Sequence, residues 1–90
     1  MSEESVVPRL APGVKFRFDA VRDAWVLLAP EKLFMPDEHA VEVLKLVDGT
    51  STLAALIDQL AATFDAPREM IAEDVAMMVR DLADKGVLRL

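Results

Sequence analysis

The chain contains no cysteine and no tyrosine, and only one histidine and three glycines among its 90 residues. The lack of cysteine excludes disulfides, thiolate metal sites and thiol nucleophiles. The single histidine leaves few side chains that could act as general bases or metal ligands. A chain of this length forms one domain, which is small for an elaborate catalytic cleft. These absences favour a function without catalysis.

Long apolar runs are also missing. None approaches the roughly 18–20 residues that cross a bilayer, and residues 1–10 lack the basic start and apolar run of a signal peptide. Yet 53% of the residues are hydrophobic, which excludes a disordered chain. We therefore expect a cytoplasmic protein that has no membrane partner.

Positive charge is scarce in the second half of the chain. Residues 1–36 carry five basic and five acidic side chains, whereas residues 37–90 carry five basic and eleven acidic ones. The whole net charge of −6 therefore lies in the second half. Because nucleic-acid affinity begins with neutralised phosphates, this balance argues against a nucleic-acid partner.

The first half has the two-residue period of β-strands. Apolar and charged residues alternate over residues 14–19, residues 25–29 are apolar on both faces, and a short apolar stretch at 32–35 ends at Pro36. Short connections between them predict three antiparallel strands within residues 14–35. The apolar faces of the second strand call for a covering layer, which the N-terminal arm, a second subunit or a partner protein could supply.

The second half changes to a helical period. Asp37 and Thr52 are suited to cap helices, Pro67 to occupy the first position of one, and Gly49 and Gly86 to end them. This predicts three helices within residues 37–86. Their predicted inward stripes are Ala40, Val43, Leu44 and Val47, then Leu53, Leu56, Ile57, Leu60, Ala61 and Phe64, then Ile71, Val75, Met78 and Leu82.

One α+β domain accounts for this order of elements: three strands followed by three helices over residues 1–90. Residues 1–9 have no hydrophobic period, and we expect a flexible arm there. The tail at residues 87–90 is too short to assign.

Few residues could carry chemistry. His39 has Val43 rather than a second ligand four positions later, so we interpret it as a solvated helix residue. A solvated face also explains the acidic residues of the last helix better than a hard-cation site does; they are Glu69, Glu73, Asp74, Asp81 and Asp84. We predict no metal site and no cofactor. Met77 fits either core packing or an adaptable binding surface.

Three segments stand out together: residues 14–19 (VKFRFD), residues 25–32 (WVLLAPEK) and residues 81–86 (DLADKG). With them, residues 8–88 resemble the PqqD family, small accessory proteins of pyrroloquinoline quinone (PQQ) biosynthesis. The segment from Trp25 to Lys32 is the most specific part. One departure is Pro36-Asp37, where the family usually has a Leu-Asn pair before the first helix.

The resemblance implies a winged-helix-like fold and the function of a RiPP recognition element, which binds the leader of a ribosomally made precursor peptide. Such a protein binds the peptide PqqA and presents it to the radical SAM enzyme PqqE, without chemistry of its own. Relatives take the leader as an added strand between the third strand and the third helix. The peptide-binding residues predicted on this basis are Lys32, Leu33, Phe34, Met35, Met70, Asp74, Met77 and Asp81.

Other functions stay open at this point. Arg80 could pair with an acidic peptide residue or be solvated. The order of elements also suits a winged-helix nucleic-acid-binding protein. A third possibility is a binder or carrier of the quinone product, or a small enzyme of the pathway, for which the basic cluster would be Lys15, Arg17, Arg22 and Lys32. Whether the chain forms a homodimer, and which surface meets PqqE, the sequence leaves undecided.

Overall fold

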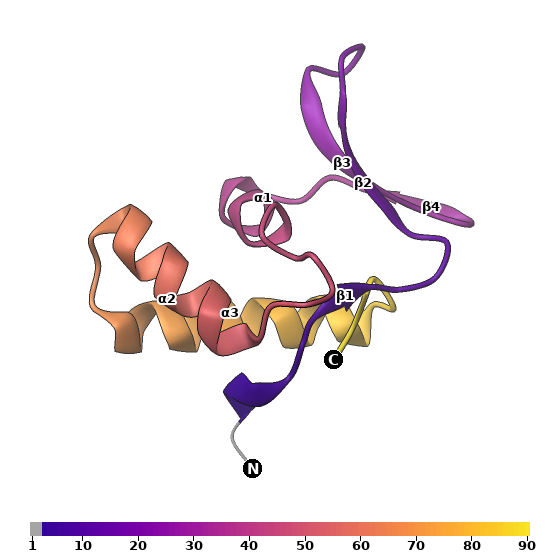
Figure 1. Cartoon of the computed structure of the whole chain (residues 1–90). Coiled ribbons are helices and arrows are strands. Elements are labelled where there is room, and N and C mark those ends of the chain that lie inside the picture. The colour runs from indigo at the N-terminus through magenta and orange to yellow at the C-terminus, as the bar shows by residue number, and fades with distance from the viewer. Residues whose placement is uncertain (1–2) are drawn as a thin grey trace.

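The computed structural model describes residues 3–90. Three strands followed by three helices form the body of the molecule, as predicted, and two short strands near the termini are added to it (Figure 1). The elements in order are η1 (Glu3–Ser5), β1 (Arg9–Leu10), β2 (Lys15–Asp19), β3 (Ala24–Ala29), β4 (Lys32–Phe34), α1 (Glu38–Leu44), α2 (Leu53–Phe64), α3 (Arg68–Asp84) and β5 (Leu88–Arg89).

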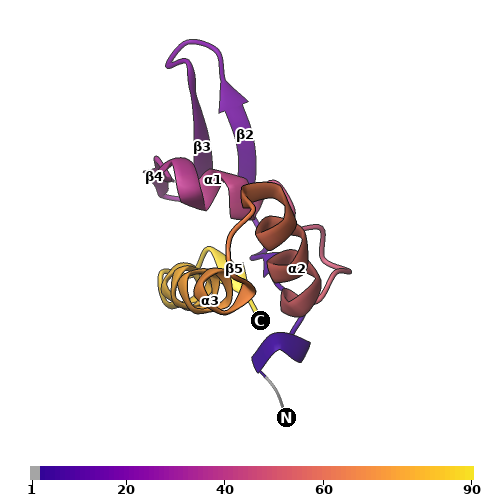
Figure 2. The same cartoon turned by 90° about the vertical axis from the view of Figure 1, so that its left-hand side faces the viewer.

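The predicted strands form an antiparallel sheet in the order β2-β3-β4. Its β2–β3 hairpin projects from the body (Figure 2), and Asp19 holds the turn by accepting hydrogen bonds from the backbone N–H groups of Val21 and Arg22. On the face toward α1, Trp25 stacks on Phe16 with ring centroids 4.7 Å apart, and the Lys45 ammonium lies 5.4 Å from the Trp25 ring. The aromatic side chains thus join the base of the hairpin to the end of α1.

The N-terminal segment is not the flexible arm that we expected, and it does not cover the sheet. β1 pairs antiparallel with β5, opposing Leu10 to Leu88, and the Leu53 N–H donates to the Val6 carbonyl at 2.8 Å. Pro8 is among the most fully buried residues. The prediction was wrong for residues 3–9 because this segment gains its partners from the far end of the chain; residues 1–2 of the predicted arm lie outside the described residues.

The helices begin at the predicted caps. The Asp37 carboxylate accepts from the Ala40 N–H at 2.8 Å, and the Thr52 hydroxyl accepts from the Ala55 N–H at 3.2 Å. α1 ends at Leu44, one turn before the predicted stop at Gly49. α3 ends at Asp84, and Gly86, with a φ of +79°, forms the left-handed turn that leads the chain into β5.

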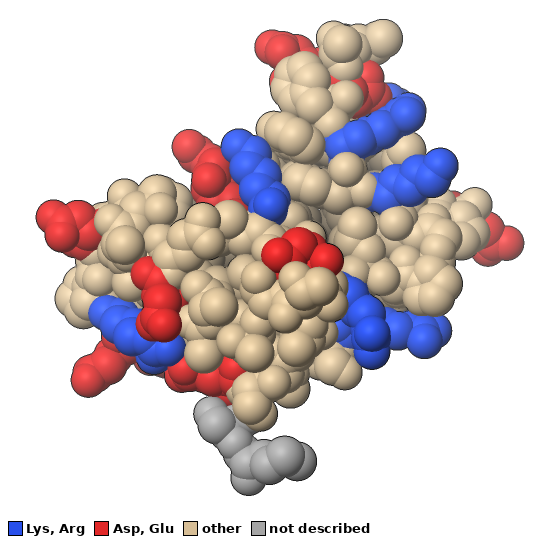
Figure 3. All heavy atoms as spheres, in the orientation of Figure 1, with Lys and Arg blue, Asp and Glu red and all other residues tan. Residues whose placement is uncertain are grey.

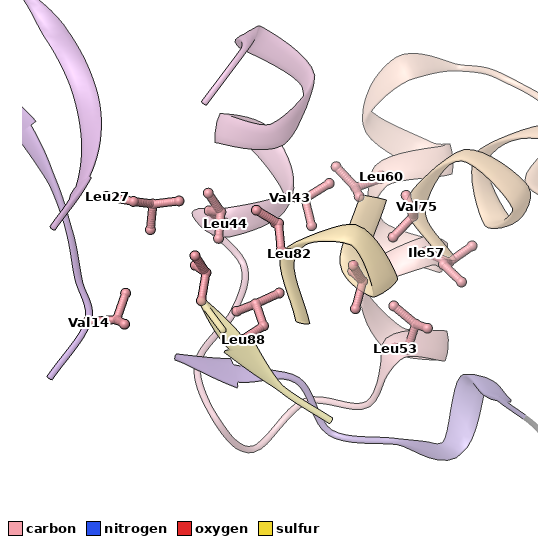
Figure 4. Packing of buried hydrophobic residues seen from close by; sticks show 12 residues of the cluster. Val14, Leu27, Val43, Leu44, Leu53, Ile57, Leu60, Val75, Leu82 and Leu88 are labelled. Carbon is pink, nitrogen blue, oxygen red and sulfur yellow. The ribbon is translucent and has the colours of Figure 1, made fainter. Parts of the chain in front are cut away.

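The core lies where α1, α2 and α3 meet the β1–β5 pair and the inner face of the larger sheet (Figure 4). Leu27 and Val14 approach it from the sheet, and Leu53 and Ile57 from α2. The predicted stripe on α3 omitted Val79, which is 1% exposed. Its neighbour Met78, predicted as core, is half-buried. In the described part of the chain, no helix is long and apolar enough to cross a bilayer.

Candidate functional site

An open strand edge runs along β4, the outer strand of the three-stranded sheet. Only Pro30 and Glu31 separate β3 from β4, so the first pair, Ala29 with Lys32, is a hydrogen-bonded one. The next pair, Leu28 with Leu33, is then not hydrogen-bonded, because the two kinds alternate along an antiparallel ladder. The backbone N–H and C=O of Leu33 therefore point away from β3, toward the edge.

A hollow of about 190 Å³ separates β4 from the C-terminal half of α3. Phe34 and Met35 border it on one side and Asp81 and Lys85 on the other. The remaining lining residues are Leu27, Pro36, Asp37, Ala40, Met78 and Leu82. The hollow thus offers an apolar floor beside the backbone groups of the strand edge.

A larger cavity of about 430 Å³ lies between α1, α2 and the N-terminal half of α3. Its lining is mostly apolar, with Asp37, His39 and Asp74 as its charged or ionisable members. The other lining residues are Val43, Leu60, Phe64, Ile71, Val75, Met77 and Met78. Asp37 and Met78 line both hollows, so the two form one groove along α3.

The predicted site residues divide between this groove and other places. Phe34, Met35 and Asp81 line the smaller hollow, and Asp74 and Met77 line the larger cavity. The other three line neither hollow: Lys32, Leu33 and Met70. The Leu33 side chain lies on the sheet face opposite Phe34, since neighbouring strand residues alternate, and Met70 is exposed in the first turn of α3.

Sequence reasoning missed several groove residues. His39 is exposed, as expected for a solvated helix residue, but it also borders the larger cavity; Phe64 and Met78 were interpreted as core. Phe64 is 48% exposed and is the last apolar residue in the stripe of α2. Its position in the last turn of the helix was the signal that it could lie outside the core. Met78 differs from Val79 by one step of about 100° around α3, and the apolar pattern alone could not rank the two.

The charges of the groove are mainly negative. Asp37, Asp74 and Asp81 line it, and its basic residue, Lys85, donates to the Asp81 carboxylate at 2.8 Å. Asp37 also caps α1. Basic side chains, by contrast, gather along the sheet on the face that Figure 3 shows. Within the described residues, no three acidic or histidine side chains are placed to hold a metal ion.

The side of α3 away from β4 is tied to the rest of the molecule. Arg68 donates to the Glu4 carboxylate at 2.7 Å and also pairs with Asp58. These two carboxylates raise the pKa of the Arg68 guanidinium above its usual value, chiefly through the hydrogen bond to Glu4. The network joins η1, α2 and α3, so one side of α3 is held while the other borders the groove.

A profile of the family described as "Coenzyme PQQ synthesis protein D (PqqD)" matches residues 24–88. The chain belongs to the PqqD family. The chain is also 52% identical, over 85 residues, to the "PqqA binding protein" of Bradyrhizobium diazoefficiens, which covers 94% of this chain and 82% of that protein. The resemblance seen in the sequence is thereby confirmed.

Two solved PqqD structures share the fold. The solution NMR structure of the PqqD part of Methylobacterium extorquens PqqCD superposes with a TM-score of 0.80 at 48% identity, covering 97% of this chain and 93% of that one. It is described as a functional, stand-alone RiPP recognition element. The crystal structure of PqqD from Xanthomonas campestris gives a TM-score of 0.62 at 42% identity, covering 100% and 99% of the two chains.

The departure from the usual PqqD pattern at Pro36-Asp37 is accommodated locally. Asp37 performs the capping that the family's asparagine would perform, through its hydrogen bond to the Ala40 N–H. Pro36 is half-buried and lines the smaller hollow, where it follows the end of β4. Pro36-Asp37 therefore leaves α1 capped and places a conformationally rigid residue in the lining of the groove.

Proposed function

We propose that this chain binds the precursor peptide PqqA in PQQ biosynthesis, as a RiPP recognition element that performs no catalysis. The observation that carries the proposal is the open edge of β4 beside an apolar hollow on α3. Membership of the PqqD family and similarity to a PqqA binding protein support it. The chain acts as one peptide-recognition domain over residues 1–90.

The peptide adds a strand to the sheet. Its backbone pairs with the outward N–H and C=O of Leu33, and alternate side chains point into the hollow between β4 and α3. Backbone pairing supplies affinity that does not depend on sequence, and the hollow selects side chains. A disordered peptide loses conformational entropy as it docks, which limits the affinity gained per unit of buried area.

The predicted residues have different roles in this binding mode. Phe34 and Met35 form the strand wall of the groove, and Asp74, Met77 and Asp81 form the helix wall. Leu33 acts through its backbone, while Lys32 begins the strand and Met70 lies beyond the ends of both hollows. The groove thus uses side chains from the end of β4 and from most of the length of α3.

Presentation to PqqE completes the proposed function. By holding the peptide, the chain raises its effective concentration at the enzyme rather than lowering a chemical barrier. Sedimentation of the chain with and without PqqE tests whether it binds the enzyme and whether it forms a homodimer. A cytoplasmic location stays a prediction.

The other functions find less support in the geometry. The basic residues considered for a tricarboxylate quinone, Lys15, Arg17, Arg22 and Lys32, line neither hollow of the groove. Arg22 is paired with Asp19 at 2.6 Å. For a nucleic-acid binder, α3 would need a basic surface, yet it contains two arginines and five acidic residues, and Arg68 is held by Glu4 and Asp58.

Substitutions at Leu33 test the strand-addition mode. Leu33→Pro removes the outward N–H without removing a bond to β3, because edge positions of this kind tolerate proline. We expect its affinity for synthetic PqqA, measured by calorimetry, to fall at least tenfold. The matched control Leu33→Ala keeps the N–H and should bind within about threefold of the wild type. A folded Leu33→Pro variant that binds PqqA normally would disprove the pairing.

A further inference from the structure

The larger cavity lies beyond the reach of a strand that only pairs with β4. Its walls come from α1, α2 and the first half of α3, and it joins the smaller hollow at Asp37 and Met78. β4 runs toward Pro36 and Asp37, so a peptide strand that follows its edge past Met35 reaches the mouth of this cavity. The groove therefore continues where the sheet ends.

We propose that this cavity is a second subsite, which takes one large apolar side chain of the bound peptide. The inference rests on the proposed function and adds a second anchor to it. Its volume of about 430 Å³ lies within the roughly 300–1,000 Å³ range of sites that enclose organic groups. Leu60, Ile71 and Val75 supply aliphatic walls, and Phe64 supplies an aromatic one.

The helix spacing sets the distance between the two anchors. Asp81 borders the smaller hollow and Asp74 the larger cavity, seven positions earlier on α3. Seven residues of helix span about 10 Å, which an extended peptide covers in about three residues. The second apolar anchor is thus expected about three residues from the side chain that fills the hollow at β4.

The charges around the cavity restrict which peptide residues can lie next to the apolar anchor. Asp37 and Asp74 both line it, and the ionisable residue beside them is His39. A carboxylate next to the apolar anchor would face two carboxylates at short range, which disfavours acidic neighbours. The same two residues disfavour the tricarboxylate quinone as an occupant. The subsite therefore selects an apolar peptide residue with neutral or basic neighbours.

The two isoleucines of the chain provide the direct test. Ile71 lines the cavity and is half-buried, whereas Ile57 is fully buried in the core outside this cavity. In the full chain with ¹³C-labelled isoleucine δ1 methyl groups, synthetic PqqA should shift the Ile71 signal and leave Ile57 nearly unchanged. Contacts from the Ile71 methyl to one large apolar peptide residue, seen as intermolecular NOEs, would identify the anchor.

A matched pair of variants measures its energetic effect. Phe64 and Phe18 are 48% and 47% exposed, but only Phe64 lines the cavity; Phe18 lies on the hairpin beside Trp25. Phe64→Glu should weaken PqqA binding at least tenfold, and Phe18→Glu should bind within about twofold of the wild type. Replacing the identified peptide anchor by alanine should weaken binding to the wild type by a similar factor.

The outcomes separate the subsite from the proposed function. If PqqA binds and Leu33→Pro weakens it, but Ile71 is unmoved and Phe64→Glu binds normally, the second subsite is wrong and peptide binding stands. If the wild-type chain does not bind PqqA at all, both proposals fail. Because the NMR readout uses the unaltered chain, it decides the question even if Phe64→Glu does not fold.

Discussion

The two sheets of the molecule differ in what lies beside their strands. The β1–β5 pair is folded against the core: Val87 and Leu88 are 1% and 3% exposed, and the Ala11 N–H donates to the Val87 carbonyl. The larger sheet ends at β4, where Phe34 is half-buried and the Leu33 backbone points outward. Pairing of β1 with β5 closes the fold, whereas β4 leaves an unpaired edge beside the proposed peptide groove.

The difference shows how a chain of 90 residues combines stability with binding. Burying the β1–β5 pair removes apolar surface from water and joins residues near both ends of the chain. Leaving β4 unpaired on one side keeps hydrogen-bonding groups free for a partner, at the risk of unwanted strand pairing. We therefore expect stability and the proposed peptide recognition to depend on different sheets and to respond to different substitutions.

The largest effect on folding stability is expected in the β1–β5 pair. Leu88→Ala removes a side chain that is 3% exposed and opposed to Leu10, and should lower the free energy of unfolding by about 2–5 kcal/mol. Denaturant unfolding followed by circular dichroism measures this loss. Leu90→Ala, at a position that is 48% exposed, is the control and should change stability by less than about 0.5 kcal/mol. The folded Leu88→Ala protein should still bind PqqA normally.

A substitution on β4 of the larger sheet should cost less stability than Leu88→Ala and should weaken PqqA binding. Phe34 is half-buried and lines the groove, so Phe34→Ala should cost about 1–2 kcal/mol of stability and weaken PqqA binding about tenfold. Parallel unfolding and calorimetry on the same preparation give both numbers. A loss of stability as large as that of Leu88→Ala, without a change in affinity, would break the comparison.

Removing a helix cap that lies away from both sheets should affect stability alone, which sharpens the comparison between the two sheets. Thr52→Ala removes the hydroxyl that accepts from the Ala55 N–H and should lower the free energy of unfolding by about 1 kcal/mol without changing PqqA affinity. Thr63→Ala, whose exposed hydroxyl donates within α2 to the Gln59 carbonyl, is the matched control and should be nearly neutral. If Thr52→Ala changed affinity, the groove would depend on α2 more than its geometry indicates.

The smallest effect is a pH dependence in the loop between α1 and α2. Backbone N–H groups of Ser51 and Thr50 lower the pKa of Asp48 to about 2 from its usual 3.8. Since the folded pKa is the lower one, the stabilisation is present above about pH 4 and is lost as the pH falls toward 2. Unfolding of the wild type and Asp48→Asn should differ at pH 6, and the difference should shrink below pH 4.

Local patterns explain the elements that were predicted well. Alternation over residues 14–19 and the helical stripe from Leu53 to Leu60 each depend on neighbours in sequence, and Asp37 and Thr52 cap helices through atoms three residues away. Such signals are contained in a short window. They predicted the order of three strands and three helices without reference to the rest of the chain.

Contacts between distant residues explain what was missed. Leu10 opposes Leu88 in the β1–β5 pair, and nothing near either residue indicates the other. On α3, the choice between Met78 and Val79 as core depends on how the helix is rotated against α2. The cavity residues His39 and Phe64 come from two helices whose approach no local pattern describes.

The amino-acid sequence by itself determined the three strands of the larger sheet, the three helices, the caps of α1 and α2, and the family. Periodicity and capping act over a few residues, and the family segments are contiguous. It also placed Phe34 on a strand, and Asp74, Met77 and Asp81 on the last helix, and these residues border the groove. Only the tertiary structure decided that β1 pairs with β5, that the Leu33 side chain faces away from the groove, and that a second cavity continues the groove. Those outcomes depend on strand register and helix rotation, which are set when the whole core packs together.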